Sequence, residues 1–386
     1  MKPSDLLVVG GGPAGLATAI FAARAGMSVE VFERGSLPRD KACGEGLMPY
    51  GVGLLREMGV CLNPDDYRPF DGIRYVSGGH SASADFGGSK GWGIRRAALS
   101  EALERRAQEL GVSVHAQTVV GRCDWSRGGE ARLETATGTF RGRWLVAADG
   151  LHSRLRREAG LGRAPARAWP RSAARYGLRR HFQRRPWSRY VEVHWAAGLE
   201  AYVTPVSESE VGIALLFDKR ATGSSSPMSF QQGLSRFPDI ARELEGCAPT
   251  SPVMAGGPFR QRCRRRFDRR LALVGDAAGY SDAISGEGVA LGFREARSLV
   301  EVLVEDQPLE QYEAAYREAT RPYYQMTELL LLLAARPWLR RRAVAMLARN
   351  PELFERLLRI HHEGRPLREL GVSGAAMLVR GLMRAS

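Results

Sequence analysis

The most constraining feature of this chain is a glycine-rich turn at residues 8–15, between a short apolar run and a stretch of small residues. A second apolar run follows and ends at the acid Glu33. This pattern predicts a β-α-β unit with the glycines in its first turn. Gly10 permits the tight bend, Gly12 lets the backbone approach a pyrophosphate, and Gly15 allows close packing of helix on strand. The unit is predicted to bind a dinucleotide, with its phosphates at the helix N-terminus and a ribose at Glu33.

Helix and strand patterns alternate along the chain and are interrupted once. Residues 97–110 favour a helix, and residues 144–150 favour a buried strand. Between about 165 and 260 the pattern changes to consecutive strands, which indicates an inserted, sheet-based domain. We therefore expect an α/β fold with a Rossmann-like domain, an inserted β-sheet substrate domain and a C-terminal helical region. The predicted boundaries are 1–75, 92–165 and 265–307 for the discontinuous nucleotide-binding domain, 76–91 and 166–264 for the substrate domain, and 308–386 for the helical region.

The 386 residues carry a net charge of +14, which comes mostly from arginine. Such a balance is compatible with nucleic acid, anionic lipid or an acidic ligand. The sequence shows no nucleic-acid-binding module, so no nucleic-acid partner is expected. Five widely spaced cysteines form neither CxxC pairs nor a disulfide-like framework, which favours a reducing compartment and no metal site. Because the N-terminus enters a predicted strand within five residues, there is no room for a signal peptide, and a cytoplasmic protein is expected.

The region after residue 308 is predicted to be helical, with apolar residues and arginines alternating over 339–358. Its longest apolar run, 329–335, is far shorter than the ~20 residues that span a bilayer. Two interpretations of this region stay open. It is either a helical cap with solvated arginines, or a basic amphipathic surface that contacts the inner face of the membrane and receives a lipophilic substrate. The sequence does not determine the oligomeric state.

Two further motifs define the ligand. The first has the form DGxxSxxR and occupies residues 149–156. The second is Gly275-Asp276, followed by Gly286-Glu287-Gly288. With these motifs, residues 1–300 resemble the superfamily of p-hydroxybenzoate hydroxylase-like monooxygenases and geranylgeranyl reductases. The resemblance implies that the dinucleotide is FAD and that the first domain is an FAD-binding domain of the glutathione-reductase type.

The resemblance also implies a role for individual residues. Asp276 would bind the ribityl chain, and the turn through Gly286 and Gly288 would face the flavin pyrimidine edge, where the following helix dipole favours negative charge. Arg96 would lie near the diphosphate, and the Val120 backbone would contact adenine. The full set predicted to bind FAD is Gly10, Gly12, Pro13, Ala14, Gly15, Glu33, Arg34, Cys43, Gly44, Arg96, Val120, Asp149, Asp276, Gly286, Gly288 and Val289.

The Cys-Gly-Glu-Gly segment at residues 43–46 bears on the reaction. It is similar to a segment that lies beside the flavin in geranylgeranyl reductases, and to the Lys-x-Gly-Glu segment of flavin halogenases. In the substrate domain, reductases carry Tyr-x-Trp-x-Phe-Pro and halogenases carry Trp-x-Trp-x-Ile-Pro. This chain keeps only Pro205, with Glu200 at the first aromatic position and Tyr202 at the tryptophan position. The difference argues against a halogenase and weakens the case for an isoprenoid reductase.

The chain as a whole is similar to flavoprotein hydroxylases associated with type III polyketide synthases, which act on alkylresorcinols and related phenolic lipids. That resemblance implies an FAD-dependent monooxygenase of secondary metabolism. NAD(P)H would reduce FAD, O2 would form a C4a-hydroperoxide, and a phenolate carbon would attack its distal oxygen. The sequence shows no second dinucleotide fingerprint, so NAD(P)H is expected to bind transiently. The alternatives are a geranylgeranyl-reductase-like reduction of isoprenoid C=C bonds and a non-catalytic flavoprotein.

The sequence singles out no catalytic base. Cys43 is a candidate because it lies in the segment predicted to lie beside the flavin, where its side chain can pack or donate a proton. Tyr202, His194, Glu200 and His80 are candidates because they fall in segments expected to form the substrate domain. For each of these four, a packing or surface role is the simpler interpretation.

Overall fold

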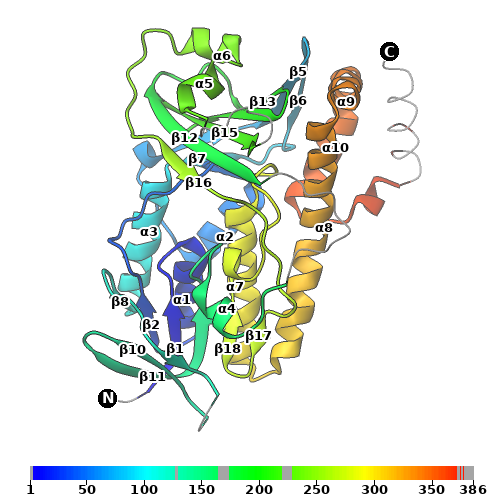
Figure 1. The fold of residues 1–386 in the computed structure, drawn as a ribbon. Helices are drawn as coiled ribbons and strands as arrows, with labels where there is room; N and C mark the ends of the chain where they lie inside the picture. The colour runs from blue at the N-terminus through cyan, green and yellow to red at the C-terminus, as the bar shows by residue number, and fades with distance from the viewer. Residues whose placement is uncertain are drawn as a thin grey trace.

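The computed structural model describes residues 3–126, 129–163, 174–219 and 228–371, together with residues 374 and 377. Figure 1 shows one sheet in each half of the molecule, with long C-terminal helices running alongside both. The predicted fold, a Rossmann-like domain with an inserted sheet and C-terminal helices, is confirmed. Residues 166–173 and 220–227 of the predicted substrate domain, and most of the predicted helical region after residue 371, lie outside the described residues.

The first sheet forms the centre of the nucleotide-binding half. Its strands are β1 (Ser4–Val9), β2 (Val29–Phe32), β8 (Ser113–His115), β9 (Cys123–Asp124), β10 (Ala131–Thr135), β11 (Gly138–Ala147), β17 (Phe267–Asp268) and β18 (Leu271–Leu273). Strands β18, β11, β1, β2 and β8 are parallel and adjacent in this order, while β9 and β10 extend β11 as a hairpin. Because β1 is central and buried, the glycine turn that follows it lies at the middle of the carboxyl edge.

Helices α1 (Pro13–Arg24), α3 (Arg96–Glu109) and α7 (Gly288–Val304) pack on one face of this sheet. The turn between β1 and α1 requires glycine at two positions. Gly10 has a φ of +114°, and a Cβ there would lie 2.3 Å from the Ala148 carbonyl oxygen. A Cβ on Gly15 would lie 1.9 Å from the Gly10 carbonyl oxygen. Close contact between helix and strand therefore depends on both glycines.

The second sheet forms the centre of the substrate half. Its strands are β5 (Gly72–Ser77), β6 (His80–Asp85), β12 (Arg175–Gln183), β13 (Tyr190–Ala196), β14 (Leu199–Pro205), β15 (Glu210–Asp218) and β16 (Met254–Gly256). They run in the order β16-β12-β15-β14-β13-β5-β6, antiparallel except for β13 and β5. Short helices α5 (Phe230–Leu234) and α6 (Pro238–Glu243) pack on one face. The other face turns toward the first half.

A small third sheet, β3-β7-β4, connects these halves. It consists of β3 (Gly46–Leu47), β4 (Tyr67–Phe70) and β7 (Gly91–Ile94), and helix α2 (Pro49–Met58) follows β3. Other short elements are η1 (Pro64–Asp66), α4 (Arg154–Glu158) and η3 (Gly275–Ala277). Because β3 begins within the Cys-Gly-Glu-Gly segment, its pairing with β7 fixes the end of that segment.

The C-terminal helices span both halves. They are α8 (Leu309–Ala335), α9 (Pro337–Arg349) and α10 (Pro351–His362), followed by η4 (Leu367–Leu370). At its start α8 is anchored to the first sheet, where the Tyr312 hydroxyl donates to the Leu273 carbonyl at 2.7 Å. Farther along, Leu330 packs into the core of the substrate half, and α9 and α10 contact β6. Within the described residues, none of the helices has the length and apolar character needed to cross a membrane.

Candidate active site

A large cavity lies between the two halves. One end is lined by the glycine turn, the segment around Cys43 and the start of α7. The other end is lined by the second sheet, α8 and α10. Since both ends belong to one continuous cavity, a ligand at one end can contact a ligand at the other.

The glycine turn lines the nucleotide end through Gly12, Pro13 and Ala14. A Cβ built on Gly12 would meet only the Arg96 guanidinium, at 3.9 Å, so the space beside this backbone is open. Arg96 is 9% exposed, and its Nε has no hydrogen-bond partner among the described residues. A buried guanidinium and the N–H groups of a helix N-terminus together suit a pyrophosphate. These residues therefore fit the diphosphate of FAD.

The start of α7 lines the next part of the cavity through Gly286, Gly288 and Val289. The helix begins at Gly288, so its positive dipole end faces the cavity. Asp276 lines the cavity nearby. Burial raises the pKa of its carboxyl group, while the positive charges of Lys41 and Arg96 oppose that rise. A hydrogen-bonding carboxyl group beside helix N–H groups fits the ribityl chain and pyrimidine edge of a flavin.

The DGxxSxxR motif lies next to the nucleotide end of the cavity, where its hydrogen bonds connect two segments of the chain. Asp149 Oδ2 accepts the backbone N–H of Arg154 at 2.8 Å, at the start of α4. The Arg156 guanidinium donates to the Ala277 carbonyl at 3.2 Å. The motif thereby connects the end of β11 to the segment that carries Asp276. Asp149 Oδ1 is buried and has no hydrogen-bond partner within the described part of the chain.

The remaining predicted FAD-binding residues lie outside the lining of the cavity. Glu33 is buried, accepts the backbone N–H of Gly11 at 2.9 Å and pairs with Arg39. Its carboxylate therefore supports the glycine turn directly. Arg34 is exposed, and Val120 is buried in the core beside the first sheet. Contacts of Glu33, Arg34 and Val120 with FAD stay predictions.

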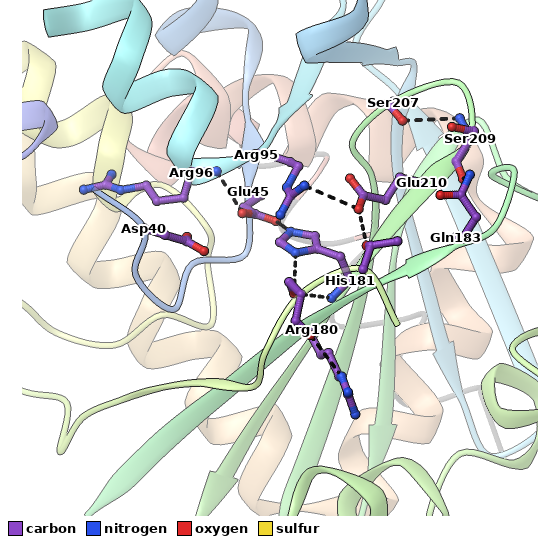
Figure 2. A network of polar contacts seen from close by, with 12 residues as sticks. Asp40, Glu45, Arg95, Arg96, Arg180, His181, Gln183, Ser207, Ser209 and Glu210 are labelled. Atoms are coloured by element: carbon purple, nitrogen blue, oxygen red, sulfur yellow. Dashed lines mark hydrogen bonds and ion pairs between the residues drawn. The ribbon is translucent and has the colours of Figure 1, made fainter. Parts of the chain in front are cut away.

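A buried polar network fixes the segment around Cys43 (Figure 2). One carboxylate oxygen of Glu45 accepts the Arg96 backbone N–H at 2.8 Å, and the other lies 2.6 Å from His181 Nε2 on β12. His181 Nδ1 in turn lies 2.8 Å from the Ser251 hydroxyl. Glu45 itself has a φ of +61°, which is unusual for a residue with a side chain. The network holds this strained backbone and joins the segment to the substrate sheet.

Cys43 lines the cavity within this segment. The Glu45 backbone N–H donates to its sulfur at 3.4 Å. Burial raises the pKa of the Cys43 thiol, although Arg96 acts in the opposite direction. The group is therefore a protonated thiol at neutral pH, which can donate a proton but is a poor nucleophile.

The substrate end of the cavity has a mostly apolar wall. The wall includes Ile73 and Tyr75 from β5, Val191 and Val193 from β13, Leu216 from β15, Leu330 from α8 and Leu358 from α10. Residues two apart on one strand share a face, so Val191 and Val193 line the cavity while Glu192 and His194 lie on the opposite face. This end of the cavity suits a lipophilic ligand.

Tyr202 is a candidate residue that the structure brings to this wall. Its hydroxyl donates to the Ile284 carbonyl at 2.8 Å, and burial raises its pKa well above the usual value. Tyr202 is therefore a fixed hydrogen-bond donor rather than a base.

The other three candidates do not line the cavity. His194 lies 3.1 Å from Glu192 on the far face of β13. Glu200 is buried and paired with Arg175, which also pairs with Asp282. His80 is exposed, at the start of β6. Of these three, only His194 lies on the face of the second sheet opposite the cavity, whereas Glu200 shares the face of Tyr202 but is held by Arg175.

Sequence reasoning missed His361, which reaches the cavity from α10. The helical period carried the signal, because His361 follows the buried residues Phe354 and Leu358 by seven and three positions. It also missed His181 as the partner of Glu45. No local pattern joins these two residues, which are 136 positions apart in the sequence.

The fold and the cavity define a flavin-dependent oxidoreductase, with FAD as its cofactor. The chain belongs to the family described as FAD binding domain, whose model matches residues 4–314.

Known proteins agree with that assignment. A menaquinone reductase of Mycobacterium tuberculosis (strain CDC 1551 / Oshkosh) is 30% identical over 321 residues, which cover 78% of this chain and 76% of the relative. Digeranylgeranylglycerophospholipid reductase 1 of Methanopyrus kandleri is 27% identical and covers 78% of this chain and 80% of its own length. The structure of the flavin-dependent brominase Bmp2 has a TM-score of 0.79 at 18% identity and covers 99% of this chain and 98% of that protein. The likeness to the brominase concerns the fold alone.

Proposed function

We propose that the protein is an FAD-dependent monooxygenase that hydroxylates a lipophilic phenol, such as an alkylresorcinol, using NAD(P)H and O2. A ring C–H bond becomes C–OH, one oxygen atom enters the ring, the other leaves as water, and NAD(P)H supplies the two electrons. The apolar wall of the cavity, directly adjoining the flavin end, carries this proposal. An alkyl chain buried against such a wall contributes about 0.8 kcal/mol per methylene group.

When bound, FAD would supply the redox chemistry, with NAD(P)H as the source of electrons and O2 as the oxidant. The residues of the chain bind and orient the reactants. The start of α7 would hold the flavin ring with its backbone N–H groups and would favour negative charge on it. The apolar residues of β5, β13 and β15 exclude water from the reacting atoms.

The second sheet supports a substrate other than a simple isoprenoid chain. Glu200 stands where the reductase pattern has an aromatic residue. The Arg175 guanidinium donates to both of its carboxylate oxygens, at 3.3 and 2.5 Å, and to Asp282 at 2.9 Å. A buried ion cluster thus stands beside the cavity at the position where the reductase pattern has an aromatic side chain.

A second candidate function is the FAD-dependent reduction of a C=C bond in an isoprenoid chain. The Cys43 thiol favours it, because this protonated group lines the cavity and can supply the proton that accompanies hydride transfer. The names of the menaquinone and digeranylgeranylglycerophospholipid reductases point the same way.

Mass spectrometry of the products distinguishes the two reactions. Purified holoenzyme, NAD(P)H and isotopically heavy O2 would be offered pentadecylresorcinol and a geranylgeranyl lipid in parallel. We expect one heavy oxygen in the resorcinol product. A gain of two hydrogens in the geranylgeranyl lipid, with no heavy oxygen in either product, would replace the monooxygenase by the reductase.

A further inference from the structure

Two buried titratable groups meet where the start of α7 approaches α10. Nε2 of His361 lies 3.8 Å from Oε1 of Glu287. The two side chains are only 10% and 9% exposed. Neither of these two atoms has a hydrogen-bond partner among the described residues. A buried polar atom without a partner costs about 1–3 kcal/mol, so two of them side by side call for an explanation.

Their position supplies that explanation. His361 lines the cavity together with Leu358, which belongs to its apolar wall. Glu287 directly precedes α7 and lies between Gly286 and Gly288, which line the flavin end. The pair therefore lies where the apolar wall meets the flavin end. A ligand that places a hydroxyl group at this point would satisfy the free imidazole nitrogen.

Burial also sets the protonation of the pair. It raises the pKa of Glu287 to about 8 and lowers the pKa of His361 to about 4. The neighbouring His362 lowers the pKa of His361 further, while a hydrogen bond with the Ser285 backbone opposes the change. Tyr323, the titratable group that α8 brings near Glu287, carries no charge at neutral pH because burial raises its pKa. At neutral pH the imidazole is therefore unprotonated, so that its free nitrogen can accept a proton, and Glu287 carries its own proton.

We propose that His361 is the base that activates the phenol and that Glu287 is its partner. This inference rests on the proposed function, because an isoprenoid chain has no hydroxyl group to activate. The ring hydroxyl gives its proton to His361 Nε2, the O–H bond breaks, and the electron pair stays on the oxygen as a phenolate. The negative charge makes the ring carbon beside it electron-rich, as hydroxylation requires. The carboxyl group of Glu287 keeps its proton, and its oxygen 3.8 Å from Nε2 can accept a hydrogen bond from the imidazolium N–H that forms.

His362→Gln is a matched control for His361→Gln. His362 is adjacent in sequence, is also buried, and both of its ring nitrogens lack partners within the described residues. Its ring packs edge-on against Phe86, at 5.3 Å between centroids, and it does not line the cavity. The two substitutions therefore remove the same group at neighbouring positions, one facing the ligand and one facing the core.

The test measures hydroxylation of pentadecylresorcinol, FAD content and the dissociation constant of the resorcinol, the last from its effect on flavin fluorescence. We expect His361→Gln to lower the hydroxylation rate about 100-fold or more. FAD content and the dissociation constant should change less than about threefold, as expected of a group that acts in proton transfer rather than in folding. His362→Gln should keep all three values within about threefold of the wild type.

Two outcomes overturn the proposal. If His361→Gln hydroxylates as fast as His362→Gln, the imidazole is not the base. If Glu287→Leu, which removes the accepting oxygen, hydroxylates at the wild-type rate, Glu287 is not its partner. His361→Asn serves as a second variant if His361→Gln loses FAD. A wild-type enzyme that forms no hydroxylated resorcinol contradicts the proposed function itself, which separates that failure from a failure of the pair.

Discussion

The two ends of the cavity are built by different means. At the nucleotide end the backbone makes the site, because Gly10 and Gly15 set the turn and Gly12 leaves space beside it. At the substrate end side chains make the site, since alternate residues of β13 and neighbouring strands form the wall. A backbone site tolerates few residue types and leaves a motif, whereas a side-chain wall can change without altering the fold. One FAD-binding half can thus serve many substrates.

The largest expected effect is the loss of the fold in Gly15→Val. A Cβ at this position would lie 1.9 Å from the Gly10 carbonyl oxygen, and relief would require α1 to move away from β1. We expect no soluble, folded protein, as judged by yield and circular dichroism. A soluble variant that retains FAD would show that the nucleotide end is less constrained by its backbone than the contact distance implies.

Gly12→Val separates cofactor binding from folding. Its Cβ would meet only Arg96, at 3.9 Å, so the empty protein can accommodate the side chain. The same space is predicted to hold the FAD pyrophosphate. We expect FAD affinity to fall more than about 100-fold, which corresponds to a loss of about 2.7 kcal/mol of binding free energy. The circular dichroism of the apoprotein should be unchanged. A yellow, fully active variant would contradict the assignment of the first turn.

Glu287 lies where the two ends of the cavity meet, and Glu287→Gln tests its burial through the pH dependence of the free energy of unfolding. Burial holds the pKa of Glu287 at about 8 in the native state, against an ordinary value of 4.5. Between pH 4.5 and 8 the unfolded chain loses this proton and the native protein keeps it, so the free energy of unfolding falls as pH rises. The decline should approach about 1.4 kcal/mol per pH unit. Denaturant titrations at several pH values should show a smaller decline of the free energy of unfolding in Glu287→Gln than in the wild type. If the two proteins show the same decline, the Glu287 carboxylate is exposed to water rather than buried.

The sequence predicted the nucleotide end more completely than the substrate end. The predicted helix from Pro13 and the predicted strand up to Glu33 correspond to α1 (Pro13–Arg24) and β2 (Val29–Phe32). These elements follow from short-range pattern and from glycine geometry. The pairing of β5 with β13 was not predicted, because it joins segments far apart in sequence.

The candidate residues show the same limit. His194 falls in the region that was predicted to form strands, but the face on which its side chain lies depends on which side of the sheet meets the first half. His361 lines the cavity because α10 packs against β6, and no sequence motif marks this residue. A residue whose role depends on tertiary packing leaves little local signal.

The smallest expected effect compares two neighbouring residues of β13 that lie on opposite faces. Val193→Phe adds a ring to the apolar wall and should weaken binding of pentadecylresorcinol about tenfold, because small changes of volume in an apolar pocket have effects of this size. His194→Phe places the same ring beside Phe237, on the face covered by α5 and α6, and should leave resorcinol binding unchanged. FAD content should match the wild type in both variants, since neither residue lies near the nucleotide end. Titration of each holoenzyme, followed by flavin fluorescence, gives the two dissociation constants. Equal effects of the two substitutions would mean that the sheet as a whole, rather than its cavity face, determines substrate binding.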